Sequence, residues 1–125
     1  MKLFEAISGD MVNHLIALCR QELNLVDLPP IKFIIDQPFI RNVSKKSFGE
    51  FDGNCIKVVS MNRHPVDVMR TLAHEITHWK QQQVGQFMDG SDGSDTENEA
   101  NAMAGIIMRK FGVRYPNYFI NTLPN

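Results

Sequence analysis

Apolar residues recur every three or four positions in three parts of the chain, and this spacing predicts three amphipathic helices. The predicted helices cover residues 2–24, 62–85 and 96–111. In the first, Ser8-Gly9-Asp10 can interrupt or restart the helix, and Asp10 is a candidate N-cap. Gly85 and Gly112 are expected to end the second and third helices, because glycine accepts the left-handed conformation found after many helices.

β-prone runs between the first two helices predict a small sheet. Residues 31–35 form a compact apolar strand candidate, and residues 39–43 a second, shorter one. Residues 47–51 and 54–59 are predicted to pair as a hairpin around the Asp52-Gly53 turn. The sequence therefore predicts an α+β fold with a short mixed or antiparallel sheet.

The remaining segments fit a single domain spanning residues 1–125, without internal repeats. Residues 89–95 are polar and acidic, but their spacing lacks the ligand pattern of a helix-loop-helix calcium site, so a solvated connector is expected. Residues 113–120 are rich in aromatic side chains and are expected to fold back onto the core. His14, in the first helix, has no acidic or histidine partner at ligand spacing and is expected to be half-exposed.

Composition narrows the classes of function. The chain has 125 residues, 43% hydrophobic content and a net charge of −1, which gives no electrostatic reason to bind nucleic acid or an acidic membrane. Two cysteines, Cys19 and Cys55, are too few for a disulfide framework. No stretch is apolar enough to cross a bilayer, and the N-terminus lacks the apolar run of a signal peptide. We expect a soluble, cytoplasmic protein that is monomeric.

The second predicted helix contains the motif His74-Glu75-x-x-His78. Histidines four residues apart lie on one face of a helix, so both imidazoles can reach one metal ion. Glu75 then lies beside the ion, where it can take a proton from a water that the metal activates. This pattern predicts a Zn2+ site with His74 and His78 as ligands and Glu75 as the catalytic general base.

A catalytic zinc site usually has a third protein ligand and one open position. Because no histidine follows His78, a histidine ligand from downstream is excluded. Two carboxylates, Glu97 and Glu99, lie at the start of the third predicted helix. Each also fits a capping box, so one can cap the helix while the other binds the metal. The residues alone leave both open.

The two helices together resemble those of the ImmA/IrrE-type metallopeptidases and the minigluzincins. Residues 97–108 read E-N-E-A-N-A-M-A-G-I-I-M, which is similar to the glutamate helix of that family, and residues 72–78 are similar to its first helix. The resemblance covers about residues 48–108 and departs at Arg109, where the family has proline, and at Thr77, where glycine is common. It implies a zincin-like fold of gluzincin type, with an active-site helix and a glutamate helix, and Glu99 as the third metal ligand.

The resemblance implies a zinc-dependent endopeptidase that acts on a protein or peptide substrate. The strand at residues 56–59 is expected to form the upper rim of the cleft, where an extended substrate can pair with it. Asn101 and Glu97 are candidates to hold the imidazoles of the ligands. An oxyanion stabiliser is also expected, and its candidates are Tyr115, Tyr118, His64 and Arg114.

Two other functions remain open from the sequence. One is a zinc hydrolase of another amide, such as a cell-wall peptide. The other is a catalytically silent or latent zinc-binding module for protein interaction, of viral or mobile-element origin. An occluded fourth zinc position, covered by the acidic loop or the aromatic tail, would favour that module. The sequence contains no helix-turn-helix or other DNA-reading module.

Overall fold

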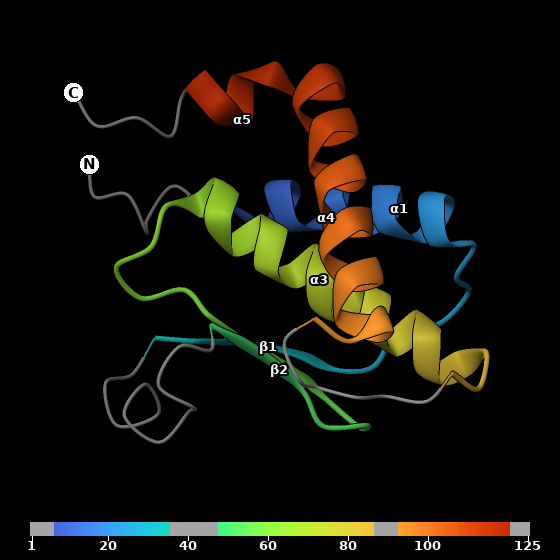
Figure 1. Cartoon of the computed structure of the whole chain (residues 1–125). Helices are drawn as coiled ribbons and strands as arrows, with labels where there is room; N and C mark the ends of the chain where they lie inside the picture. The colour runs from blue at the N-terminus through green and yellow to red at the C-terminus, as the bar shows by residue number, and fades with distance from the viewer. Residues whose placement is uncertain (1–6, 36–47, 87–92, 121–125) are drawn as a thin grey trace.

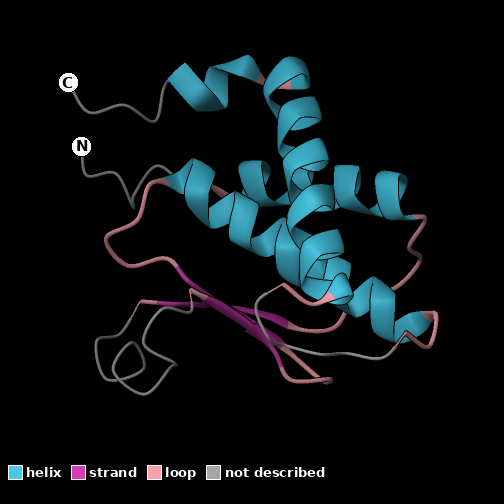
Figure 2. Cartoon of the chain, viewed as in Figure 1, coloured by secondary structure: helices cyan, strands magenta, loops and turns pink. Residues whose placement is uncertain are grey.

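A computed structural model describes residues 7–35, 48–86 and 93–120 of the chain. Within these residues, a three-stranded sheet lies on one side of the helices (Figures 1 and 2). The elements in chain order are α1 (Gly9–Leu23), β1 (Ile31–Ile34), β2 (Gly49–Phe51), β3 (Ile56–Val59), α3 (Pro65–Gln83), α4 (Asp95–Arg114) and α5 (Pro116–Ile120). The α+β class is thereby confirmed. The predicted strand at 39–43 and most of the acidic loop lie outside the described residues.

Helix α1 begins at Gly9, where the sequence allowed the helix to restart, and its N-cap is Ser8 rather than Asp10. Residues 2–6 of the predicted helix lie outside the described residues. The Ser8 hydroxyl accepts a hydrogen bond from the backbone N–H of Met11 at 3.1 Å. Asp10 lies instead in the first turn, where its negative charge interacts favourably with the positive end of the helix dipole. Asn24 ends the helix in the left-handed conformation, with φ 54°.

The sheet is mixed, with the strand order β1-β3-β2. β2 and β3 form the predicted antiparallel hairpin, and the Asp52 carboxylate accepts hydrogen bonds from the backbone N–H groups of Asn54 and Cys55 in its turn. β1 pairs with β3 in parallel on the other side. The expectation that an extended substrate pairs with residues 56–59 is therefore wrong, because β3 is hydrogen-bonded to a strand on each side.

Helix α3 packs against the sheet on one face and against α4 and α1 on the other (Figure 1). His64 caps its N-terminus, Pro65 occupies its first turn, and Gly85 follows its end with φ 79°. The hydrophobic core lies between the helices and the sheet. It consists of fully or nearly fully buried side chains, among them Met11, Leu15, Ile56, Val58, Met69, Leu72, Ile76, Ile107 and Phe111.

Helix α4 does not end at Gly112, as expected, but continues to Arg114. A Cβ atom at residue 112 would lie 3.3 Å from the ring of Phe119, so the glycine gives α5 room to pack closely against α4. The aromatic tail folds back as predicted, and Tyr115, Tyr118 and Phe119 pack against the core. Among the helices of the described ranges, none has the length and apolarity needed to span a membrane.

Candidate metal centre

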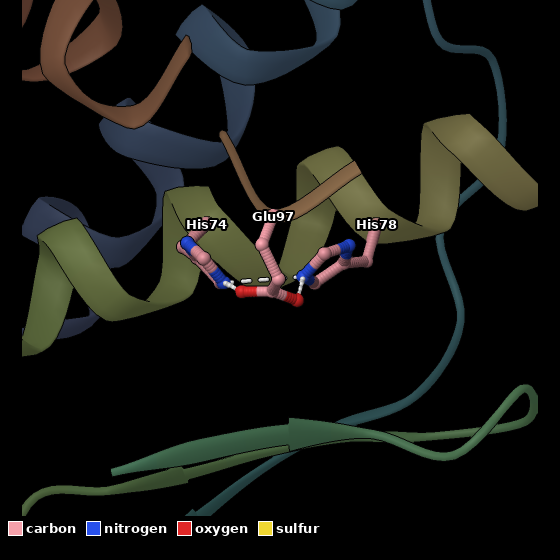
Figure 3. Close-up of side chains that lie close together, drawn as sticks. All are labelled: His74, His78 and Glu97. Atoms are coloured by element: carbon pink, nitrogen blue, oxygen red, sulfur yellow. Dashed lines mark hydrogen bonds and ion pairs between the residues drawn. The ribbon is translucent and has the colours of Figure 1, made fainter. Parts of the chain in front are cut away.

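Helix α3 presents His74 and His78 on the side that faces the sheet (Figure 3). Leu72, Ala73 and Ile76 are fully buried, and they fix the rotation of the helix about its axis. The two Nε2 atoms lie 3.1 Å apart, and the imidazole planes are nearly perpendicular, at 84°. The sequence prediction that both imidazoles reach one point is consistent with this geometry.

The carboxylate that meets the two imidazoles belongs to Glu97, at the start of α4. Its Oε1 lies 3.2 Å from His74 Nε2, and its Oε2 lies 2.8 Å from His78 Nε2. Figure 3 shows the Glu97 side chain between the two rings. These three residues form the only group of three or more potential metal-ligating side chains within the described part of the chain.

The structure does not bring Glu99, the residue that the family resemblance implied, into this group. At about 100° per residue, Glu97 lies about 50° from the middle of the buried stripe of α4, whereas Glu99 lies about 110° away on its other side. That stripe comprises Thr96, Ala100, Ala104, Ile107, Met108 and Phe111. Glu97 therefore points toward α3, whereas Glu99 is exposed and its Oε1 accepts a hydrogen bond from Gln81.

Each histidine also has a side-chain amide as a partner. The His78 Nδ1 atom lies 2.7 Å from Gln81 Oε1, and the side chain of Asn101 is close enough to the imidazole of His74 to raise its pKa. Burial and the neighbouring His78 lower the pKa of His74, while Glu97 and Asn101 act in the opposite direction. Sequence reasoning named Asn101 but missed Gln81. The signal for Gln81 was its position three residues after His78, on the same helical face.

The donor set fits zinc. Nitrogen and oxygen ligands at about 2.0–2.2 Å from a tetrahedral zinc ion lie about 3.3–3.6 Å from one another. The corresponding distances of 3.1, 3.2 and 2.8 Å are slightly shorter, so a small outward movement of the side chains would admit an ion. Atoms with lone pairs approach this closely only when a proton or a cation lies between them.

Glu75 is buried beside this group, with 6% of its surface exposed. Burial raises its pKa to about 8, and the nearby charges of Glu97 and Glu50 add to the shift. Its carboxyl group faces strand β2, where a Cβ atom at residue 49 would lie 3.0 Å from Glu75 Oε2. Gly49 thus leaves the space that the Glu75 side chain occupies.

The four proposed oxyanion stabilisers lie elsewhere, which corrects that expectation. Tyr115 and Tyr118 contact His14 at the far end of α4, about 27 Å along the helix axis from Glu97 in the case of Tyr115. Arg114 is the last residue of the same helix. His64 caps α3, about 15 Å along the axis from His74, and its Nδ1 accepts a hydrogen bond from the backbone of Val66.

No family model, curated protein or solved structure matches this chain. The function must therefore be inferred from the arrangement of residues at the site.

Proposed function

We propose that this chain is a zinc-dependent endopeptidase with a zincin-like fold. His74, His78 and Glu97 would hold the ion, and Glu75 would be the general base. The observation that carries the proposal is the convergence of two imidazole Nε2 atoms and one carboxylate at distances of 2.8 to 3.2 Å. The resemblance of α3 and α4 to the helices of the ImmA/IrrE-type metallopeptidases supports it.

When bound, zinc supplies Lewis acidity, which lowers the pKa of a water molecule and polarises a carbonyl group. The role of Glu75 follows from its position one residue after His74, beside the ligands and out of solvent. It would accept the proton of the attacking water and then pass that proton to the leaving amine of the peptide. A carboxyl group with a pKa near neutral can perform both transfers.

The position of the aromatic tail favours an enzyme over a silent binding module. The module would be favoured if the acidic loop, most of which lies outside the described residues, or the aromatic tail covered the metal centre. Instead, α5 packs at the end of α4 opposite to Glu97, and His14 stacks on Tyr115 there with ring centroids 4.4 Å apart (Figure 1). The tail therefore leaves the side of the cluster that faces the sheet uncovered by its aromatic residues.

The test is to measure zinc affinity, by competition with a chelator, and cleavage of a denatured protein for the full-length chain and three variants. Glu97→Gln should weaken zinc binding by more than about 100-fold, the upper limit for residues that only support a ligand. Glu99→Gln is the matched control and should stay within about tenfold of wild type. Glu75→Gln should keep zinc and lose cleavage.

Other outcomes have distinct meanings. Zinc lost by Glu99→Gln and kept by Glu97→Gln would transfer the ligand role to Glu99. A wild-type chain that binds zinc and cleaves no denatured protein or peptide would contradict the endopeptidase and favour the binding module. Absence of zinc binding in every sample would make the cluster a histidine–carboxylate ion pair.

A further inference from the structure

Gln81 lies one helical turn after His78, and its side-chain amide is almost completely buried, with 1% of the residue exposed. Three hydrogen bonds use both ends of this amide. Its Oε1 faces His78 Nδ1 at 2.7 Å. Its Nε2 donates to Glu99 Oε1 at 2.7 Å and to the backbone carbonyl of Thr96 at 2.9 Å. Gln81 thereby connects the end of α3 with the start of α4.

These contacts fix the orientation of the amide. The backbone carbonyl of Thr96 can only accept a hydrogen bond, and the ionised carboxylate of Glu99 can likewise only accept. The NH₂ group of Gln81 must therefore point toward Thr96 and Glu99, and its oxygen must point toward His78. An oxygen in that position requires a donor, so the proton of His78 lies on Nδ1.

A proton on Nδ1 leaves the lone pair of a neutral imidazole on Nε2. That atom is the one directed at Glu97 and His74, at 2.8 and 3.1 Å. Zinc requires this tautomer, because the metal takes the place of a proton on Nε2. The charge of Glu99 also polarises the amide, which strengthens the hydrogen bond that Gln81 Oε1 accepts from His78.

We propose that Gln81, anchored by Glu99 and the Thr96 carbonyl, is a positioning residue that holds His78 with its Nε2 lone pair directed at the metal. This inference rests on the proposed function, because it needs His78 to be a ligand. It assigns Glu99 a role in the site that acts through Gln81 and not by contact with the ion. The same chain of contacts couples the metal centre to the packing of α3 against α4.

The experiment is a double-mutant cycle on zinc affinity with Gln81→Met and Glu99→Ala. Gln81→Met keeps the side-chain length and removes the acceptor for His78 Nδ1, and it should weaken zinc binding about 10- to 100-fold. Glu99→Ala should weaken binding several-fold in the wild-type background and have no further effect together with Gln81→Met. Gln83→Met, an exposed position at the end of the same helix, is the matched control and should leave affinity unchanged.

A second readout separates positioning from mere structural support. In the zinc-loaded protein, NMR should show a slowly exchanging Nδ1 proton on His78 that exchanges rapidly in Gln81→Met, while circular dichroism shows that both remain folded. Equal zinc affinity in wild type and Gln81→Met, or additive effects of the two substitutions, would overturn the proposal and leave the proposed function intact. A wild-type chain that binds no zinc would overturn both.

Discussion

Glu75 should destabilise the metal-free protein, and the size of this effect should depend on pH. The carboxyl group is 6% exposed, and burial together with the charges of Glu97 and Glu50 raises its pKa from 4.5 to about 8. Below pH 4.5 the group is protonated in both the folded and the unfolded chain. Between 4.5 and about 8 the unfolded chain loses the proton that the folded chain keeps, so the free energy of unfolding falls as pH rises.

Glu75→Gln removes this penalty because the amide stays neutral at every pH. The shift of about 3.5 units corresponds to at most about 5 kcal/mol, accumulated at no more than about 1.4 kcal/mol per pH unit. The difference in free energy of unfolding between Glu75→Gln and wild type should therefore increase from pH 5 to pH 8 and then remain constant. The amide adds a constant offset of its own, so the slope with pH is the quantity to compare.

Urea unfolding of the full-length chain in the presence of a chelator, from pH 5 to pH 9, measures this difference. Glu50→Gln removes only the neighbouring charge that has the smaller effect on the pKa of Glu75. The difference in free energy of unfolding between Glu50→Gln and wild type should therefore change much less with pH. A difference for Glu75→Gln that does not change with pH would refute the reasoning, because it would show that Glu75 ionises in the folded chain as it does in water. The expected result would show that Glu75 lowers the stability of the folded chain. Its presence would then be explained by its proposed role as the general base, since active-site residues commonly lower stability.

Two further predictions concern packing. Gly49→Ala places a Cβ atom 2.5 Å from Thr71 Cγ2 and 3.0 Å from Glu75 Oε2. Because the new atom displaces Glu75, cleavage should fall more than zinc affinity. Thermal or urea unfolding should show that the free energy of unfolding falls by about 1–3 kcal/mol. Gly105→Ala is the matched control, because nothing lies within 4 Å of the added atom in mid-helix, and it should stabilise by about 0.5–1 kcal/mol. Phe111→Ala should cost about 3–5 kcal/mol in urea unfolding, because Phe111 is fully buried against the rings of α5, while the 80% exposed Val113 can be changed to alanine within about 0.5 kcal/mol. Equal effects at positions 111 and 113 would contradict the packing of α5 described above.

The sequence predicted the elements well where the pattern of apolar residues was local. The periodicity of α1, α3 and α4 follows from single helices packing on one core, and the hairpin follows from Asp52-Gly53 between two β-prone runs. The predicted end of α4 was wrong because a glycine can either end a helix or allow another element to pack closely against it. At Gly112 the absence of a side chain makes room for Phe119, which depends on a contact with another helix and not on the local sequence. The prediction that a substrate pairs with β3 was wrong for a similar reason, because the pairing of β3 with β1 depends on a segment distant in the chain.

The candidate metal centre shows which parts of a site can be predicted from the sequence and which depend on the packing of two helices. His74 and His78 are predictable because both lie on one helix, and their separation depends only on helix geometry. The choice between Glu97 and Glu99 depends on the rotation of α4 against α3, which is set by the stripe of buried residues from Thr96 to Phe111. That stripe is visible in the sequence, and its small residues Ala100 and Ala104 indicate the face that packs closely. For the third ligand, the position of this stripe around the helix favours Glu97, whereas the sequence resemblance to the metallopeptidase family favours Glu99. The structure gives both acids a place at one centre, since Glu97 lies between the imidazoles and Glu99 is joined to His78 through Gln81.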